Sequence, residues 1–274
     1  MNFPRILKKR KGYIDRIKPF MQKSVAKVLT GQRRVGKSFL LYQLIEEILA
    51  EEPDANIIYV NLEDFTFSSL QTAEDLHSYI ISHSKEKVKN HSFIDEIQDI
   101  PGFEKVIRSL LLNEDNDIYI TGSNAKMLSG ELATYLSGRY IEFKIYSLSY
   151  SEFLEFHGLT ESETSYELYS RYGGLPYLLN LPLEDETVNE YLKSVYSTIV
   201  FRDVVSRYKL RNTLFLEKLI QFLSENIGNL FSAKNISDYL KSQHTAISVN
   251  QIQSYTEYLN NAFLIHRVER YDLI

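Results

Sequence analysis

The stretch GQRRVGKS, residues 31–38, decides the fold of this 274-residue chain. Gly31 and Gly36 allow the backbone to turn so tightly that consecutive N–H groups point inward at a phosphate. Lys37 would place a compact positive charge between the β- and γ-phosphates, and the Ser38 hydroxyl would be a ligand for Mg²⁺. Each fixed position has a separate chemical role, and together they predict a nucleotide-binding loop.

The sequence on both sides of the loop supports this prediction. Residues 25–30 are rich in β-forming side chains and fit a buried strand, while apolar residues recur at helical spacing over residues 39–49. Strand, glycine-rich loop and helix is the order that the motif requires, and a glycine-rich turn without a ligand is the alternative. The candidate nucleotide-binding residues of this region are Gly31, Gln32, Arg33, Arg34, Val35, Gly36, Lys37, Ser38 and Phe39.

The composition excludes several classes of protein. The absence of cysteine excludes disulfides, thiolate catalysis and cysteine zinc sites, and it fits a cytoplasmic location. No apolar stretch approaches the length that spans a bilayer, so we expect no membrane partner. The net charge of −5 argues against a surface wholly given to nucleic acid, although a local basic face stays open. We interpret the basic run at residues 8–11 as a solvated helix face, with a contact to a phosphate backbone as the alternative.

Strands and helices alternate through the first half of the chain. The predicted strands are at residues 25–30, 56–62, 117–121 and 140–147, with a short one ending at 93–94, and the predicted helices at about 69–88 and 102–112. This alternation predicts a parallel sheet with right-handed crossovers. After about residue 149 the pattern changes to helices only, and the glycines at 173–174 mark a turn there.

The last sixty or so residues have a pattern of their own. Helices near residues 213–226, 236–242 and 248–263, followed by an extended segment at 264–271, predict a winged-helix module. The chain stops where the first strand of the wing would turn back, so the module would be truncated or closed in an unusual way. Its recognition helix, residues 248–263, contains no Lys or Arg, which disfavours DNA as a partner.

Two acidic residues, Asp95 and Glu96, follow the short strand. Because ligands bind at the carboxyl ends of parallel strands, we expect Asp95 to hold Mg²⁺, directly or through water, and Glu96 to orient the attacking water. The apolar run before Asp95 is short, because residues 89–92 are polar. An exposed acidic helix start is therefore the alternative interpretation.

These motifs resemble those of AAA+ ATPases. The resemblance rests on the phosphate loop (Walker A), the Asp-Glu-Ile-Gln box at residues 95–98 (Walker B), the Thr-Gly-Ser-Asn run at 121–124, and Gly138 with Arg139 before the last predicted strand. More narrowly, the chain is similar to the prokaryotic ATP-binding proteins of the archaeal-type and STAND-related group, over nearly its whole length. This similarity implies an α/β fold: a P-loop AAA+ parallel-sheet core with a helical lid, followed by an α+β winged-helix module.

The resemblance also divides the chain. A nucleotide-binding core would occupy residues 1–150, including an N-terminal helix at 1–22. A helical lid would occupy residues 151–210, and the winged-helix-like module residues 211–274. The cofactors implied are ATP and Mg²⁺, and ATP rather than GTP rests on the resemblance alone.

Two further roles carry over from the family. Asn124 matches sensor 1, an amide that would hydrogen-bond the γ-phosphate or the attacking water; Ser123 is the runner-up, and a helix N-cap is the structural alternative. Arg139 matches an arginine finger, which would act on a neighbour's nucleotide and so implies a nucleotide-dependent homo-oligomer. The alternative for Arg139 is a surface salt bridge.

Gly174, Leu175 and Pro176 resemble the G-x-P element of STAND ATPases, which places the helical lid against the bound nucleotide. A plain loop between helices is the alternative. Arg33 and Arg34 either add positive potential near the phosphates or face solvent. Many family members have Pro where this chain has Gln32. We do not expect that departure to change the chemistry.

The sequence therefore favours an ATPase that uses its nucleotide state as a conformational or assembly switch and acts on an unidentified protein partner. A DNA-binding regulatory protein and a protein–protein adaptor with little hydrolysis are the alternatives. A small-molecule kinase ranks last, because it would not explain Asp95 with Glu96, Asn124 or the added C-terminal module.

Overall fold

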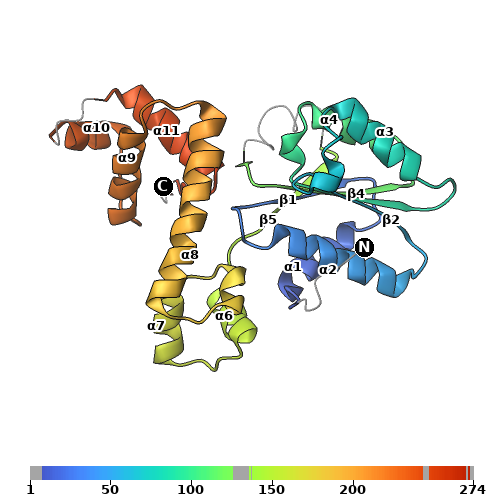
Figure 1. Cartoon of the computed structure of the whole chain (residues 1–274), viewed down its shortest axis with the longest axis horizontal. Helices are drawn as coiled ribbons and strands as arrows, with labels where there is room; N and C mark the ends of the chain where they lie inside the picture. Colours follow the sequence, from blue (N-terminus) through green and yellow to red (C-terminus); the bar gives the residue numbers. More distant parts are fainter. Residues whose placement is uncertain (1–7, 126–135, 137, 243–246, 270, 272–274) are drawn as a thin grey trace. The chain divides into compact units, whose positions relative to one another are not determined.

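The computed structural model describes residues 8–125, 136, 138–242, 247–269 and 271 (Figure 1). The chain forms two compact units, Met1–Tyr191 and Leu192–Ile274, and we describe each by itself. The predicted division at residues 150 and 210 stays a prediction. Within the described ranges, no helix combines the length and the apolar character needed to cross a bilayer.

The first unit contains a five-stranded parallel sheet in the order β2-β3-β4-β1-β5, which confirms the α/β prediction. Its strands are β1 (Ala26–Thr30), β2 (Asn56–Asn61), β3 (Asn90–Asp95), β4 (Asn116–Gly122) and β5 (Tyr140–Lys144). Thr30 pairs with Gly122, and Asn61 pairs with Asp95. The carboxyl ends of the strands therefore meet at one edge of the sheet.

Helices cover both faces of this sheet (Figure 1). On one face lie α1 (Lys11–Ile17), which runs into the short η1 (Lys18–Phe20), and α2 (Lys37–Glu51). On the other lie α3 (Ala73–His83) and α4 (Phe103–Leu110). Successive strand residues point to opposite faces, so Val28 packs in the core under α3 and α4, and Leu29 in the core under α1 and α2. Short 3₁₀ turns, η2 (Phe65–Phe67) and η3 (Ile97–Asp99), follow β2 and β3.

The helix expected at about residues 69–88 is shorter than predicted. It begins after Thr72, whose hydroxyl accepts a hydrogen bond from the Asp75 N–H while the Asp75 carboxylate accepts one from the Thr72 N–H. This reciprocal cap satisfies the free donors at the helix start. At the other end the backbone is already extended at Ser84. The prediction therefore made this helix too long at both ends.

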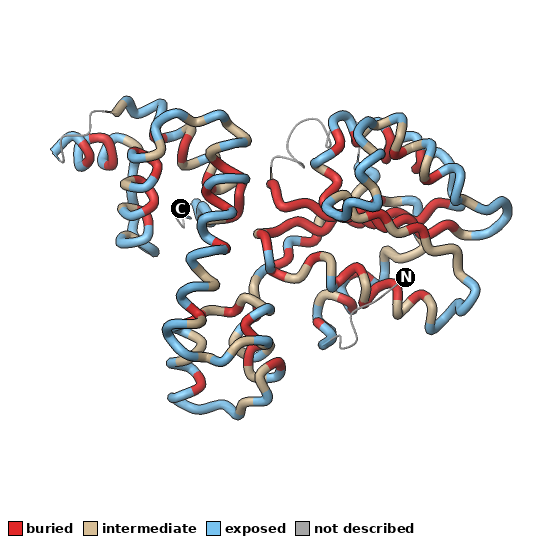
Figure 2. Tube along the Cα trace, viewed as in Figure 1, coloured by how far each residue is buried: buried red, intermediate tan, exposed pale blue. Residues whose placement is uncertain are grey.

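The central strands β1, β3 and β4 are buried along their whole length (Figure 2). The strand before Asp95 is longer than the short one predicted to end at residues 93–94, because β3 begins at Asn90 and its polar residues 90–92 are buried. Asn90 accepts a hydrogen bond from the Lys85 N–H at 2.8 Å and donates to the Lys85 carbonyl at 3.0 Å. His91 pairs with Asp117 of β4 at 2.8 Å.

Lys27, His91, Asp117 and Tyr119 form a buried network in the sheet. The Lys27 ammonium pairs with Asp117 and donates to the Val25 carbonyl at 2.9 Å, and the Tyr119 hydroxyl donates to Asp117 at 2.8 Å. Burial lowers the pKa of Lys27. Burial alone would raise the pKa of Asp117, but the hydrogen bond to His91 and the charge of Lys27 outweigh it and hold that pKa below its usual range. Each charged group in this network is stabilised by its partners, because no water reaches it.

Further along the described part of the first unit lie α6 (Tyr150–His157), α7 (Glu163–Tyr172) and the 3₁₀ segment η5 (Pro176–Asn180). The unit boundary falls within α8 (Asp185–Thr198). Ser149 and Glu152 form a capping box that begins α6, and Gly158 ends this helix in the left-handed conformation. These helices occupy the region predicted to be a lid.

The second unit continues with a π-helical stretch, η6 (Ile199–Ser206), and the helices α9 (Thr213–Glu225), α10 (Ala233–Ser242) and α11 (Val249–Asn261). The predicted helices are present. Of the predicted extended segment, residues 264–269 and 271 are described and form no strand. A wing strand needs a neighbouring strand for its hydrogen bonds, and the described part of this unit supplies none. The winged-helix architecture is therefore not confirmed.

We expect Asp117→Asn to lower the free energy of unfolding by about 3–5 kcal/mol, because the Lys27 ammonium would stay buried without a counter-charge. Urea titration followed by circular dichroism measures this change. Asp115→Asn, at an exposed position two residues earlier, is the control and should change little. A loss below about 1 kcal/mol for Asp117→Asn would contradict the proposed interdependence of these charges.

Candidate nucleotide-binding site

The phosphate loop joins β1 to α2, so the predicted order of strand, loop and helix is confirmed. Gly31 has φ +150°, and a Cβ at this position would lie 2.1 Å from the Ile145 carbonyl oxygen. Gly36 has φ +92° and precedes the first residue of α2. A side chain would clash at the first position and strain the backbone at the second. Both glycines of the motif are therefore required by the geometry of the loop.

Lys37, the first residue of α2, is 4% exposed and points its ammonium along the inside of the loop. Its Nζ donates to the Gly31 carbonyl at 3.1 Å and to the Gln32 carbonyl at 3.2 Å. The same Nζ lies 3.4 Å from the Glu96 carboxylate. One cation thus contacts both the phosphate loop and the end of β3.

Asp95, the last residue of β3, lies beside the phosphate loop. Burial raises the pKa of Asp95, and hydrogen bonds from Ser38 and Thr121 oppose that rise. Thr121 bonds Asp95 Oδ1, and the Tyr59 hydroxyl of β2 lies 3.5 Å from Asp95 Oδ2. Ser38 and Asp95 thus present a hydroxyl and a carboxylate at one point. These hard oxygen donors fit Mg²⁺, which takes one or two protein oxygens and completes its shell with phosphate and water.

Glu96 has a left-handed backbone with φ 56°, which no other residue of the predicted acidic box adopts. The Glu96 N–H donates to the Thr121 hydroxyl at 2.9 Å, and that hydroxyl in turn donates to Asp95. The Gln98 amide donates to the Glu96 carboxylate at 2.6 Å. Burial would raise the pKa of Glu96, but the charge of Lys37 and the Gln98 hydrogen bond outweigh it and hold that pKa below its usual value. Glu96 is therefore a buried carboxylate that stays charged.

Ser123 and Asn124 directly follow β4, whose neighbours in the sheet are β1 and β3. Both side chains are buried, at 1% and 9% exposure. They lie at the same edge of the sheet as Lys37 and Glu96, because all these strands are parallel. The position fits the expected sensor role, and the choice between the two side chains stays open.

The turn at residues 173–176 packs directly on the core. The Leu148 N–H donates to the Gly174 carbonyl at 2.7 Å, and a Cβ on Gly174 would lie 2.2 Å from the Leu148 carbonyl oxygen. Pro176 lies over the phosphate loop, since its Cγ is 3.7 Å from where a Cβ of Gly36 would be. The structure therefore brings this predicted lid residue to the phosphate loop.

Arg33 and Arg34 differ in their surroundings. Arg33 is 8% exposed and pairs with Glu63 at 3.0 Å, and its charge also lowers the pKa of Glu96. Arg34 has φ 68° and is exposed. Arg33 therefore adds positive potential near the site, which was one predicted alternative, and Arg34 faces solvent, which was the other. Phe39 is 48% exposed and stacks edge-on with Tyr42 of the same helix.

Arg139 lies at the amino end of the parallel strands, opposite the carboxyl end where the phosphate loop lies. It immediately precedes β5, and its carbonyl accepts a hydrogen bond from the Ala26 N–H at the start of β1. The phosphate loop follows the far end of β1. Five residues of extended strand span about 16 Å, so Arg139 cannot reach the phosphate loop of its own chain. Its side chain is exposed.

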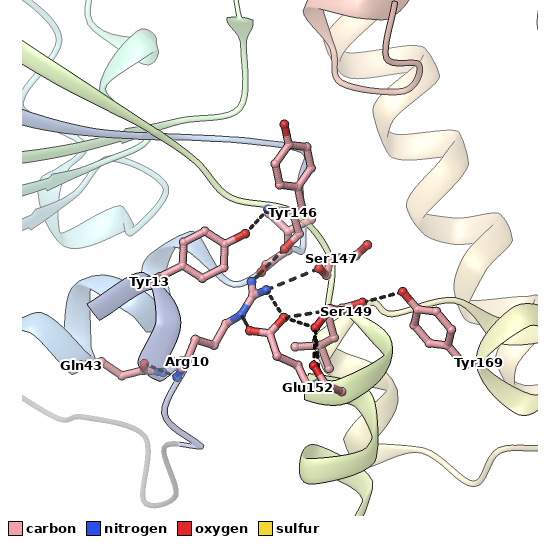
Figure 3. A network of polar contacts seen from close by, with 11 residues as sticks. Arg10, Tyr13, Gln43, Tyr146, Ser147, Ser149, Glu152 and Tyr169 are labelled. Carbon is pink, nitrogen blue, oxygen red and sulfur yellow. Dashed lines mark hydrogen bonds and ion pairs between the residues drawn. The ribbon is translucent and has the colours of Figure 1, made fainter. Parts of the chain in front are cut away.

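Sequence reasoning missed Arg10, which belongs to the basic run interpreted as a solvated helix face. Lys9 and Lys11 are exposed as expected, but residues 8–10 precede α1, so the helix predicted over residues 1–22 does not include them, and Arg10 is 4% exposed. Figure 3 shows its guanidinium between the chain that follows β5 and the start of α6. Its main partner, Glu152, is 142 residues away in sequence, so no local pattern indicates the pair.

In the sequence, Thr121 and Gln98 stand out only as members of longer motifs. Thr121 proves to hydrogen-bond both acidic residues, and Gln98 to hold the carboxylate of Glu96. The signal that could have identified Thr121 was its position, since it is a polar residue at the carboxyl end of a predicted strand that is buried.

Two protein families match this chain. Residues 23–154 match a family described as an AAA domain, and residues 163–273 match one described as a domain of unknown function (DUF8612). The first match covers the sheet, the phosphate loop and the start of α6.

Two relatives resemble most of the chain. An uncharacterized protein of Haemophilus influenzae is 37% identical over 276 residues, covering 96% of this chain and 67% of the relative. The uncharacterized protein MJ1544 of Methanocaldococcus jannaschii is 33% identical over 252 residues, covering 87% of this chain and 55% of the relative. The chain thus spans between half and about two thirds of these relatives.

Solved structures resemble it more distantly. The Aeropyrum pernix ORC1 protein in complex with DNA has a TM-score of 0.44 at 15% identity, covering 94% of this chain and 85% of that one. Domain III of the Thermotoga maritima replication initiation protein DnaA has a TM-score of 0.43 at 12% identity, covering 70% of this chain and 86% of that one.

We expect Gly174→Ala to loosen the lid from the core, because the added Cβ would overlap the Leu148 carbonyl. Overpacking of this kind lowers stability by about 1–3 kcal/mol. Thermal unfolding and limited proteolysis of residues 149–180 measure the effect.

Gly12→Ala is the matched control. Gly12 lies in α1, and a Cβ at this position would meet no other atom within 4 Å, so alanine there should stabilise the helix. Equal behaviour of the two variants would contradict the close packing of Gly174.

Proposed function

We propose that this chain, which carries the AAA domain of nucleotide-binding ATPases at residues 23–154, binds ATP with Mg²⁺ and hydrolyses it. We further propose that the nucleotide state switches its conformation or assembly. The relatives are uncharacterized, so the activity of this chain is argued from its own residues.

The observation that carries the proposal is the pairing of the phosphate-loop residues with the two acids at the carboxyl end of β3, Asp95 in the strand and Glu96 directly after it. Ser38 hydrogen-bonds Asp95, and Lys37 lies 3.4 Å from Glu96. These contacts join the parts that bind phosphate to the parts that would activate water. Because the carboxylates are buried, each charge acts at short range in a medium of low dielectric constant.

The chemistry follows from these contacts. The loop N–H groups and Lys37 would bind the β- and γ-phosphates, and Mg²⁺ held by Ser38 and Asp95 would neutralise part of their charge. A terminal phosphate would compete with Glu96 for the Lys37 ammonium. Glu96 would then accept a hydrogen bond from the water that attacks the γ-phosphorus as the bond to ADP breaks. Asn124, or Ser123, would contact the γ-phosphate or that water.

We also propose that Arg139 acts on the nucleotide of a second copy. It is exposed and lies too far from its own phosphate loop, which leaves a neighbouring subunit as the place where it could act. A homo-oligomer formed with nucleotide would provide that neighbour. The STAND-related grouping is proposed on the resemblance, the winged helix on the order of the C-terminal helices, and the cytoplasmic location on the absence of cysteine.

We infer that the second unit contacts a protein rather than DNA. Its helix α11 contains no Lys or Arg, and Ile227 and Leu230 beside α9 are 84% and 77% exposed. Affinity for DNA depends on cationic side chains that neutralise phosphates. Salt-dependent binding of duplex DNA would contradict this inference.

We expect Lys37→Ala to weaken Mg-ATP binding by about 10- to 100-fold, because it removes a charge-assisted hydrogen bond to phosphate. Glu96→Gln should keep the affinity and slow hydrolysis by about 10²- to 10⁴-fold, because an amide cannot accept the proton. Calorimetric titration and phosphate release measure the two effects. Unchanged hydrolysis in both variants, with wild-type affinity, would overturn the proposed activity.

We expect Arg139→Ala to bind ATP normally and to hydrolyse it about 10³-fold more slowly. Mixing this variant with Glu96→Gln should restore part of the activity. In the mixed oligomer, Arg139→Ala supplies the intact water-activating site, and Glu96→Gln supplies the arginine. Arg108→Ala, at an exposed position of α4, is the control. If mixing restores nothing, Arg139 does not act between subunits.

A further inference from the structure

Arg10 lies just before α1 and is the buried member of a basic run. Its backbone N–H donates to the Gln43 side chain of α2 at 2.9 Å, and its guanidinium lies 4.5 Å from the centre of the Tyr13 ring. The first contact holds the Arg10 backbone against α2, and the second places the guanidinium against α1. The extended side chain then points away from α2 toward the chain after β5 (Figure 3).

The guanidinium joins segments that are far apart in sequence. Its Nε and one terminal nitrogen each donate to the Glu152 carboxylate at 2.8 Å. The other terminal nitrogen donates to the Tyr146 carbonyl at 2.8 Å and to the Val35 carbonyl at 3.2 Å. Arg10 therefore connects the first helix of the lid, the link before it, and the phosphate loop.

The fork geometry of arginine is what permits this arrangement. A planar guanidinium can form two parallel bonds with a carboxylate and still have donors left for carbonyls. Glu152 is itself fixed, because it accepts hydrogen bonds from the Ser149 N–H at 2.9 Å as part of the α6 capping box. The pair thus orients the start of α6 and not only a flexible side chain.

The contact with Val35 has a consequence inside the phosphate loop. The Val35 carbonyl and the Gly36 N–H belong to one planar trans peptide and point in opposite directions. A donor that holds the Val35 carbonyl outward therefore turns the Gly36 N–H inward, where a phosphate-binding loop needs its donors.

We propose that Arg10 is a positioning residue that couples the lid to the phosphate loop. Through Glu152 it fixes the start of α6, and through the Val35 carbonyl it fixes a peptide of the loop. A change in the loop on nucleotide binding is thereby transmitted to the lid. The inference rests on the proposed nucleotide binding of this site.

The test compares Arg10→Gln, Glu152→Gln and the double variant in the full chain. Hydrogen–deuterium exchange without nucleotide is the first readout. We expect faster exchange in residues 31–38 and in α6 of Arg10→Gln, with β3 and β4 unchanged. A residue that only stabilises the fold would raise exchange throughout the first unit, and that outcome would overturn the proposal.

Affinity for a fluorescent non-hydrolysable ATP analogue with Mg²⁺ is the second readout. We expect about 10-fold weaker binding for Arg10→Gln, a smaller loss for Glu152→Gln, and no further loss in the double variant. Arg108→Gln, at an exposed position, is the control. Additive losses would mean that the two residues act separately, which contradicts the coupling.

The two proposals can fail independently. If the unmodified chain binds no analogue, the proposed function fails, while the exchange experiment still decides whether Arg10 couples the loop to α6. If the chain binds the analogue and Arg10→Gln binds it equally well, the coupling fails and the proposed function stands. Glu152→Gln keeps the test open should Arg10→Gln not fold, because its exchange in residues 31–38 should also rise.

Discussion

The parallel register of β1, β3 and β4 is the constraint on which the site depends. It brings three chain segments to one edge of the sheet: the loop after Thr30, the acids at the end of β3, and the residues after Gly122. Thr121 then joins them, since its hydroxyl bonds both the Glu96 N–H and the Asp95 carboxylate. A slip of one residue in any of these strands would turn each side chain to the opposite face and separate the groups.

Two groups of buried charged side chains lie at opposite ends of the sheet. At the carboxyl end, Lys37 and Arg33 lie close to the Glu96 carboxylate, and Asp95 is buried beside them. At the amino end, Lys27 and Asp117 neutralise each other. The first set is suited to exchange partners with a ligand, and the second to remain unchanged.

Much of the fold and of the candidate site could be predicted from the sequence, namely those parts whose structure is decided by local sequence pattern. The phosphate loop, the sheet strands and the acids at residues 95 and 96 follow from spacing and periodicity. The full extent of β3 could not be predicted in this way, because Asn90 and His91 look exposed until their partners Lys85 and Asp117 are known. Arg10 was missed for a similar reason, since its partners Val35, Tyr146 and Glu152 meet it only in the folded chain. The wing strand was expected from the segment at residues 264–271 that follows three helices, without a pairing strand to support it.

The buried network of Lys27, His91 and Asp117 constrains how this protein can evolve. A single replacement there leaves a charge or a polar ring without its partner in the interior. An apolar set of similar volume would fill the same space, but only when the positions change together. Substitutions at these positions should therefore be correlated among related sequences, and a lineage that replaces the network has to cross a poorly folding intermediate or acquire several mutations at once.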